Sequence, residues 1–188
     1  MPPIRAPLLA ALILAGALPA LAQDDDLDSD EAREFFAALE ADGRLSTAVR
    51  LIRASEATWF LERDDGDDEE YTLFAPTDDA FARLPAGALD ALLLEENRVA
   101  LTEILEHHLI PDDDVDLDDL EDGRALEPAT GEDLEVAVAG DAVTVGGANV
   151  VATDIEVDDG VVHVIDAVLI PDLVRDALTY RGILPEEG

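Results

Sequence analysis

The sequence predicts a mixed α+β fold, with helices in the first half of the domain and antiparallel strands in the second. Two observations support this prediction. Apolar residues recur at helical spacing over much of residues 31–107, whereas alternating and β-branched runs dominate residues 134–165. Segregated helices and strands are typical of α+β domains, because regular alternation of the two would instead build a parallel sheet. The sequence contains no internal repeat, so we expect one domain.

The first 30 residues are expected to precede that domain. Residues 1–22 have the pattern of a secretory signal peptide, with Arg5, an apolar stretch that ends at Leu18, and the small-x-small cleavage pattern Ala20-Leu21-Ala22. The apolar stretch is shorter than the about 20 residues that a membrane span needs. We therefore expect a secreted or periplasmic protein with no membrane span after cleavage, and an acidic, disordered leader at residues 23–30.

Two amphipathic helices are predicted next, at residues 31–40 and 45–60, with Gly43 at the break and Ser46 as a candidate cap of the second. A short strand at residues 71–75 follows. The side chain of Thr77 is suited to cap the next helix, and Asp78 lies where a negative charge favours the positive helix end. Further helical segments are expected at residues 87–94 and 98–107, the latter capped by Asn97.

The second half is predicted to contain two β-hairpins. Residues 134–139 alternate between apolar and polar, Gly140-Asp141 is a two-residue hairpin signal, and residues 142–145 form the returning strand. Residues 149–157 and 161–165 are expected to pair in the same way.

The last predicted strand, residues 161–165, is almost entirely β-branched, so we expect a central strand that is buried on both faces. His163 and Asp166 interrupt its apolar character. An unpaired buried polar group costs about 1–3 kcal/mol, so both residues are expected to be hydrogen-bonded structural groups. Asp172 is predicted to cap a last helix, and residues 174–188 are assigned to a C-terminal helix and tail.

Four segments in this order resemble the fasciclin (FAS1) domain family. Tyr71 to Phe81 resembles the first signature block of the family and Asp159 to Pro171 the second. His107 to Pro111 lies where the family has a Tyr-His pair followed by an apolar-Pro stretch, and Val145 to Val150 resembles the strand before the last hairpin. The resemblance covers about residues 31–173. It implies a wedge of two β-sheets with several α-helices packed alongside.

The resemblance also implies candidate partner-binding residues. In animal members the Tyr-His region and an Asp-Ile segment before the last hairpin take part in receptor binding. The corresponding residues here are His107, His108, Asp154 and Ile155. His107 replaces the usual Tyr, which departs from the family pattern. Structural roles remain open for His108, as a residue that closes a helix end, and for Asp154-Ile155, as part of an ordinary strand.

The charge balance limits the partners. The chain has 46 Asp and Glu against 11 Lys and Arg, and a formal net charge of −35. Nucleic acid and anionic membrane surfaces would repel such a protein. The carboxylates are spread along the whole chain, so we expect a solvated acidic surface adapted to high salt, where the Debye length falls to about 3 Å.

Metal and catalytic sites are not expected. The acidic runs 64–70 and 112–119 offer oxygen ligands, but neither matches an EF-hand loop, so only weak cation binding is left open. The chain has no Cys, and adjacent His107 and His108 point in different directions. Its three serines lie outside any G-x-S-x-G motif, and it has no Gly-rich phosphate loop. We therefore predict no catalysis, no cofactor and no metal.

Two functions remain besides a hydrolase or metal enzyme, which the residues support least. The resemblance implies a secreted, non-catalytic module for cell-surface or matrix adhesion, with a protein or polysaccharide as partner. The alternative is a periplasmic or extracellular binder of an apolar small molecule, a carotenoid or a lipid, in a groove between helices and sheet. The sequence leaves the oligomeric state open, because like charges oppose self-association only at low salt.

Overall fold

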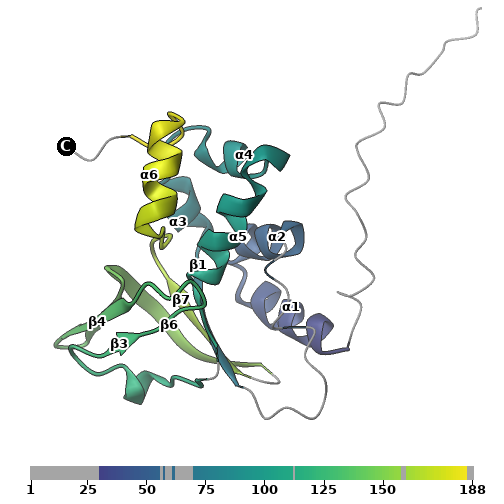
Figure 1. Cartoon of the computed structure of the whole chain (residues 1–188). Helices are drawn as coiled ribbons and strands as arrows, with labels where there is room; N and C mark the ends of the chain where they lie inside the picture. Colours follow the sequence, from purple (N-terminus) through teal and green to yellow (C-terminus); the bar gives the residue numbers. More distant parts are fainter. Residues whose placement is uncertain are drawn as a thin grey trace, which may run out of the picture.

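The computed structural model describes residues 30–55, 57, 61, 70–111, 113–157 and 160–185. The predicted signal peptide and nearly all of the leader lie outside the described residues, as does most of the acidic run 64–70. Among the residues that are described, no helix has both the length and the apolar character to cross a membrane. The mixed α+β fold is confirmed: helices gather along one side of a twisted sheet (Figure 1).

The first two helices are α1 (Asp30–Asp42) and α2 (Ser46–Ala54). α2 ends well before residue 60, so the predicted length was wrong. Ser55 stops the helix, because its hydroxyl donates to the Ile52 carbonyl at 2.9 Å and accepts the Ala57 N–H at 3.2 Å. Such local side-chain bonds compete with the helical backbone pattern.

The remaining helices cover the upper part of the molecule in Figure 1. They are α3 (Asp78–Ala82), α4 (Ala88–Leu92), the short 3₁₀ helix η3 (Glu95–Asn97), α5 (Arg98–Glu106) and α6 (Asp172–Tyr180). Asn97 precedes α5 but makes no capping bond with its side chain among the described residues, contrary to the prediction. Its amide instead donates to the Ala91 carbonyl at 2.7 Å and accepts from Arg181 beyond the end of α6.

Seven strands occur in the described part of the chain. They are β1 (Tyr71–Pro76), β2 (Leu109–Pro111), β3 (Ala125–Leu126), β4 (Leu134–Ala139), β5 (Ala142–Val145), β6 (Ala148–Val157) and β7 (Gly160–Ile165), and a 3₁₀ turn, η4 (Leu117–Asp119), precedes β3. Their hydrogen-bonded order is β2-β1-β7-β6-β5-β4-β3. Only the first residues of β6 pair with β5, whereas the rest pair with β7. β6 thus joins the two halves of the predicted wedge.

β7 lies at the centre of this order, as its β-branched sequence predicts. It pairs antiparallel with β6 and parallel with β1, in a register that places Tyr71 opposite Gly160. The sequence predicted only antiparallel pairs for β7, so its parallel pairing with β1 was not expected. Gly160 is required there, since a Cβ atom on this residue would lie 2.0 Å from the Tyr71 carbonyl oxygen.

Two hydrophobic clusters share β7. Val162 and Val164 belong to the first cluster, which α1, α2 and β1 complete. Ile165 belongs to the second, together with Phe74 of β1 and residues of β2 to β6. A third cluster joins α4, α5 and α6 through residues such as Leu92, Ile104 and Leu178. α6 therefore shares a core with the rest of the domain.

Candidate functional site

Thr77 and Asp78 connect β1, α2 and α3. The Thr77 hydroxyl accepts the Ala80 N–H at 3.1 Å and caps α3, while its own N–H donates to the Ile165 carbonyl of β7. The Asp78 carboxylate accepts the Thr47 N–H at 2.6 Å and the Ser46 hydroxyl at 2.8 Å. Burial raises the pKa of Asp78, but the hydrogen bonds from Thr47 and Ser46 outweigh it, so the net pKa is lowered. Ser46 therefore donates a hydrogen bond to Asp78 and is not the N-cap of α2, contrary to the prediction.

His163 is fully buried in β7 and has partners at both ring nitrogens. Nε2 donates to the Val115 carbonyl at 2.6 Å, and Nδ1 accepts the Asp154 N–H at 3.4 Å. The ring also stacks on Phe74, with 5.4 Å between ring centroids. This arrangement ties the loop before η4 to the central strand and leaves neither nitrogen available for chemistry.

His108 makes a similar connection below α5. Nδ1 donates to the Ile104 carbonyl at 2.6 Å, and Nε2 accepts the Leu169 N–H at 3.0 Å. Burial lowers the pKa of His108 to about 4, so the ring is neutral at physiological pH. The neighbouring His107 is 4% exposed, and its Nδ1 lies 2.8 Å from the Thr130 hydroxyl. Burial also lowers the pKa of His107, and this effect outweighs the negative charges of Glu132 and Asp172, which raise it.

Asp166 follows β7 and joins it to the start of β6. Its carboxylate accepts the Asn149 N–H at 2.8 Å and the Asn149 side-chain amide at 3.0 Å. Arg83 donates to the Asp166 carbonyl at 2.6 Å and lies 3.5 Å from its carboxylate. Burial raises the pKa of Asp166, but the bonds from Asn149 and the charge of Arg83 outweigh it and lower the pKa.

Asp154 and Ile155 lie on β6, where the pairing with β7 shifts register. Asp154 is the described non-glycine residue with positive φ, at 56°, and its side chain is 45% exposed. Its carboxylate accepts the Leu117 N–H at 3.1 Å. Ile155 is half-buried against the first cluster. Of the four candidate partner-binding residues, Asp154 is exposed and Ile155 half-buried, while both histidine rings lie inside the fold. Their role in partner binding stays a prediction.

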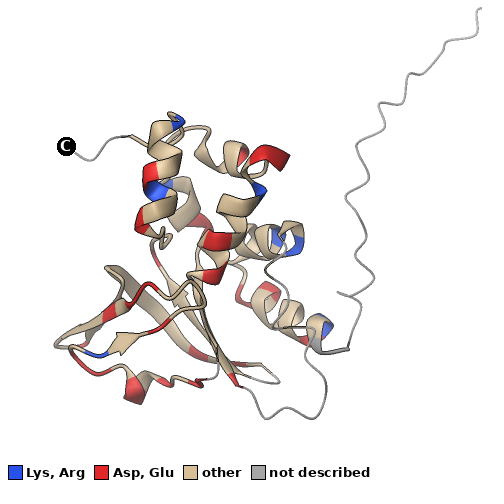
Figure 2. Ribbon diagram, in the orientation of Figure 1, with Lys and Arg blue, Asp and Glu red and all other residues tan. Residues whose placement is uncertain are grey.

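The acidic segment after β2 forms no metal centre in the described residues. No group of three or more His, Cys, Asp and Glu among them could hold a metal ion. Asp114 has a buried Oδ1 atom that finds no hydrogen-bond partner within the described chain. Burial and the nearby charges of Asp116, Glu70 and Asp113 raise the pKa of Asp114. Figure 2 shows that carboxylates are spread over helices and strands alike, with no single acidic site.

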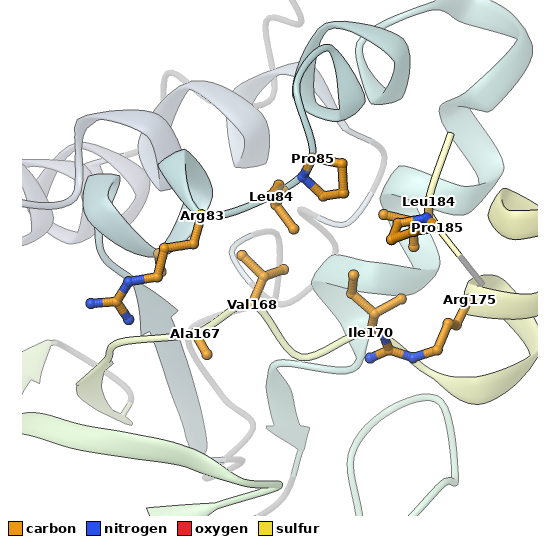
Figure 3. Close-up of a pocket in the computed structure, with 10 residues that line it drawn as sticks. Arg83, Leu84, Pro85, Ala167, Val168, Ile170, Arg175, Leu184 and Pro185 are labelled. Carbon is orange, nitrogen blue, oxygen red and sulfur yellow. The ribbon is translucent and has the colours of Figure 1, made fainter. Parts of the chain in front are cut away.

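A groove of about 370 Å³ opens between the end of α3, the segment after β7, and α6 (Figure 3). Its lining consists of Ala80, Arg83, Leu84, Pro85, Ala167, Val168, Ile170, Arg175, Leu184 and Pro185. The sequence suggested a groove between helices and sheet, whereas no described strand residue lines this groove. Most of the lining residues lie in irregular segments, where hydrophobic periodicity gives no signal. The clustering of prolines with apolar residues at 84–85, 170–171 and 184–185 was the available sign.

α6 also carries an exposed apolar stripe. Leu173, Ala177 and Tyr180 are spaced i, i+4 and i+7, which places them on one face of the helix. Leu173 is 81% and Tyr180 94% exposed. The opposite face, with Val174 and Leu178, is buried in the third cluster. The sequence predicted this helix but not which of its faces would remain open.

Comparison with known proteins gives consistent matches. The family described as Fasciclin domain matches residues 43–171. "Protein sll1483" of Synechocystis sp. is 37% identical over 128 residues, which are 68% of this chain and 68% of that protein. Human periostin is 32% identical over 77% of this chain, but the match covers 16% of periostin. The immunogenic protein MPB70 of Mycobacterium bovis is 33% identical over 54% of this chain and 50% of its own length.

A solved structure agrees in fold. It is a FAS1 domain pair from the insect cell adhesion molecule fasciclin I, with a TM-score of 0.58 and 22% identity. The alignment covers 72% of this chain and 50% of the insect one. The chain thus spans half the length of that domain pair and less than a fifth of periostin.

Proposed function

We propose a function for this chain, which belongs to the fasciclin domain family. It is a secreted or periplasmic module that binds a cell-surface or matrix protein or polysaccharide. Fasciclin domains mediate protein interactions, and proteins built on them are non-catalytic. The insect protein with the similar fold is a cell adhesion molecule.

The observation that carries this proposal is the exposed stripe on α6. A contiguous apolar surface that stays open to solvent on a folded domain can mark a site of protein interaction. Tyr is also enriched among residues that dominate interface energies. Asp78, His163 and Asp166 of the two signature blocks, by contrast, are engaged in hydrogen bonds within the fold. The surface, not these residues, is therefore available for a partner.

A binding assay on the source's own cell envelope tests the proposal. We expect the wild-type protein to bind envelope material at high salt, and a Leu173→Ser, Tyr180→Ala double variant to lose most of that binding. Val151→Ser is the matched control, because Val151 is 45% exposed on β6, a different element from α6. Equal binding by the wild type and the double variant would remove α6 as the interaction surface.

A second candidate function is binding of an apolar small molecule, a carotenoid or a lipid. The groove favours it, since eight of its ten lining residues are apolar. Its volume lies at the lower end of the about 300–1,000 Å³ typical of ligand pockets. Visible absorbance or an extractable lipid in protein purified from its native source supports this function. Colourless, lipid-free protein counts against it.

The acidic surface is proposed to be an adaptation to high salt, with weak cation binding as its consequence. The chain carries 46 acidic residues, and the described ones are spread over all parts of the fold (Figure 2). Secretion is proposed from residues 1–22, which lie outside the described residues. Cleavage after Ala22 is tested by sequencing the N-terminus of the exported protein.

A further inference from the structure

The groove differs in charge from the rest of the molecule. About one residue in four of this chain is acidic, with 46 Asp and Glu among 188 residues. The described lining contains no Asp or Glu, yet it contains two of the chain's eleven basic residues, Arg83 and Arg175. An apolar surface next to positive charge, on a strongly negative protein, is complementary to a ligand that is apolar and carries a negative group.

The two arginines approach the groove from different elements. In Figure 3 Arg83 lies at one end, beyond Ala167, while the side chain of Arg175 runs from α6 alongside Ile170. Leu84 and Pro85 lie across from Val168. A chain-like apolar ligand placed along Val168 and Ile170 therefore has a guanidinium within reach at its end.

Arg83 already has a structural contact, but it retains donors. Both of its contacts with Asp166, at 2.6 and 3.5 Å, use Nη1. A guanidinium has five N–H donors in a planar fork, which suits a carboxylate. Arg83 thus keeps Asp166 in place and still has N–H donors that these two contacts do not use. Its side chain is 64% exposed.

Resting on the apolar-ligand function proposed above, we infer that the groove binds an acyl chain that ends in a carboxylate, as a free fatty acid does. The chain lies against Leu84, Val168 and Ile170, its carboxylate pairs with Arg175 beside Ile170, and Arg83 adds positive charge at one end of the groove. A neutral or cationic amphiphile with the same chain lacks this second contribution and binds more weakly.

The test compares three probes that share one alkyl length: decanoate, decanol and decylammonium. Calorimetric titrations of the full mature chain are made near 1 M NaCl, where the Debye length of about 3 Å screens the overall negative charge and leaves only close ion pairs. We expect decanoate to bind about tenfold more tightly than decanol, and decylammonium to bind most weakly. Methyl NMR shifts at Val168 and Ile170, but not at exposed Val99, locate the ligand.

The contribution of a groove arginine to carboxylate binding is tested with Arg175→Gln. Arg83 is kept, because its replacement would also disturb Asp166. Arg50→Gln is the matched control, since Arg50 is exposed on α2 outside the groove and its loss changes the net charge equally. We expect Arg175→Gln to weaken decanoate about tenfold and to leave decanol unchanged, whereas Arg50→Gln changes neither.

The outcomes separate the two proposals. Equal affinity for decanoate and decanol, or an Arg175→Gln effect no larger than that of Arg50→Gln, overturns the carboxylate preference while the apolar-ligand function stands. Failure of all three probes to bind overturns both.

Discussion

The carboxylate of Asp78, the first residue of α3, accepts the backbone N–H of Thr47 at 2.6 Å and so caps the neighbouring helix α2. The same Asp78 donates its N–H to the Arg44 carbonyl at 2.7 Å. Leu45, the N-cap residue of α2, has no side-chain acceptor for the N–H groups of the first turn. The carboxylate of Asp78, from another segment, supplies that acceptor.

Asp78→Ala is therefore expected to destabilise the domain by about 1–2 kcal/mol, the usual loss for an N-cap carboxylate. Urea unfolding measures it. Asp79→Ala is the control, since Asp79 is its exposed neighbour at the same helix end. The hydrogen bonds lower the pKa of Asp78, so the difference between wild type and Asp78→Ala persists above the unfolded pKa and disappears as the pH falls through the lower folded one. Similar losses for both variants contradict the assignment.

His108 is predicted to make the fold sensitive to mild acid. Burial lowers its pKa to about 4, against 6.5 for an ordinary histidine. Between these two pKa values, the His108 ring is protonated in the unfolded chain but neutral in the folded protein. The contribution of His108 to stability is complete above pH 6.5 and declines by about 3 kcal/mol as the pH falls toward 4.

Ring NMR signals recorded against pH check this value directly. In urea unfolding, His108→Gln lacks the titrating ring and is expected to lose that part of the pH dependence. A His108 ring that titrates near 6.5 would contradict the prediction.

Asp114→Asn is expected to stabilise the protein at neutral pH by about 1 kcal/mol, because burial and the charges of Asp116, Glu70 and Asp113 disfavour the charged carboxylate. The raised pKa means that the charged carboxylate weakens the fold as the pH rises through that value. The advantage of the variant should therefore vanish in acid. Asp118→Asn removes a charge from an exposed residue nearby and serves as control. An Asp114→Asn protein no more stable than the control contradicts this account.

Gly160→Ala is expected to cost at least about 3 kcal/mol, since the new Cβ would overlap the backbone carbonyl of Tyr71 in the neighbouring strand. Backbone in a central pair cannot move aside cheaply. Gly140→Ala in the β4–β5 turn is the comparison: that residue has a φ of 67° but nothing within 4 Å of the added Cβ, so its cost should stay near 1 kcal/mol. Thermal melts rank the two, and equal costs would argue against the close approach.

Salt is expected to raise the melting temperature. Repulsion among 46 acidic residues acts on the compact state, and screening at molar NaCl removes most of it. Melting curves from low to molar NaCl measure the effect, and sodium perchlorate at the same ionic strength separates screening from salt-specific effects. A melting temperature that does not rise in NaCl refutes the proposed salt adaptation.

Local pattern predicted most elements but not their long-range contacts. β7 was identified because an unbroken β-branched run suits a strand buried on both faces. Its parallel partner β1 lies far away in sequence, and periodicity carries no information about pairing. The requirement of partners for His163 and Asp166 was likewise predictable, whereas the Val115 carbonyl and Asn149 amide that satisfy them were not.

Side-chain competition explains the errors at helix ends. Ser55 ends α2 through its own hydroxyl, although helical spacing of apolar residues continues beyond it. Asn97 has the side chain of a cap, but its amide bonds to Ala91 and to Arg181 from the far end of the chain. The position of the groove was not predicted, since it is formed by segments that meet only in the tertiary fold.

The pairing of Tyr71 with Gly160 also sets the order in which this protein can fold. These paired residues of the two central strands are 89 positions apart in the sequence, so closing that loop is slow and early folding must begin with local helices and hairpins. During synthesis the first helices emerge long before β7 exists. Until β7 arrives, β1 has only β2 as a neighbouring strand, and the apolar face of α2 lacks Val162 and Val164. A chain that is exported before folding would complete this step only after it has left the cytoplasm.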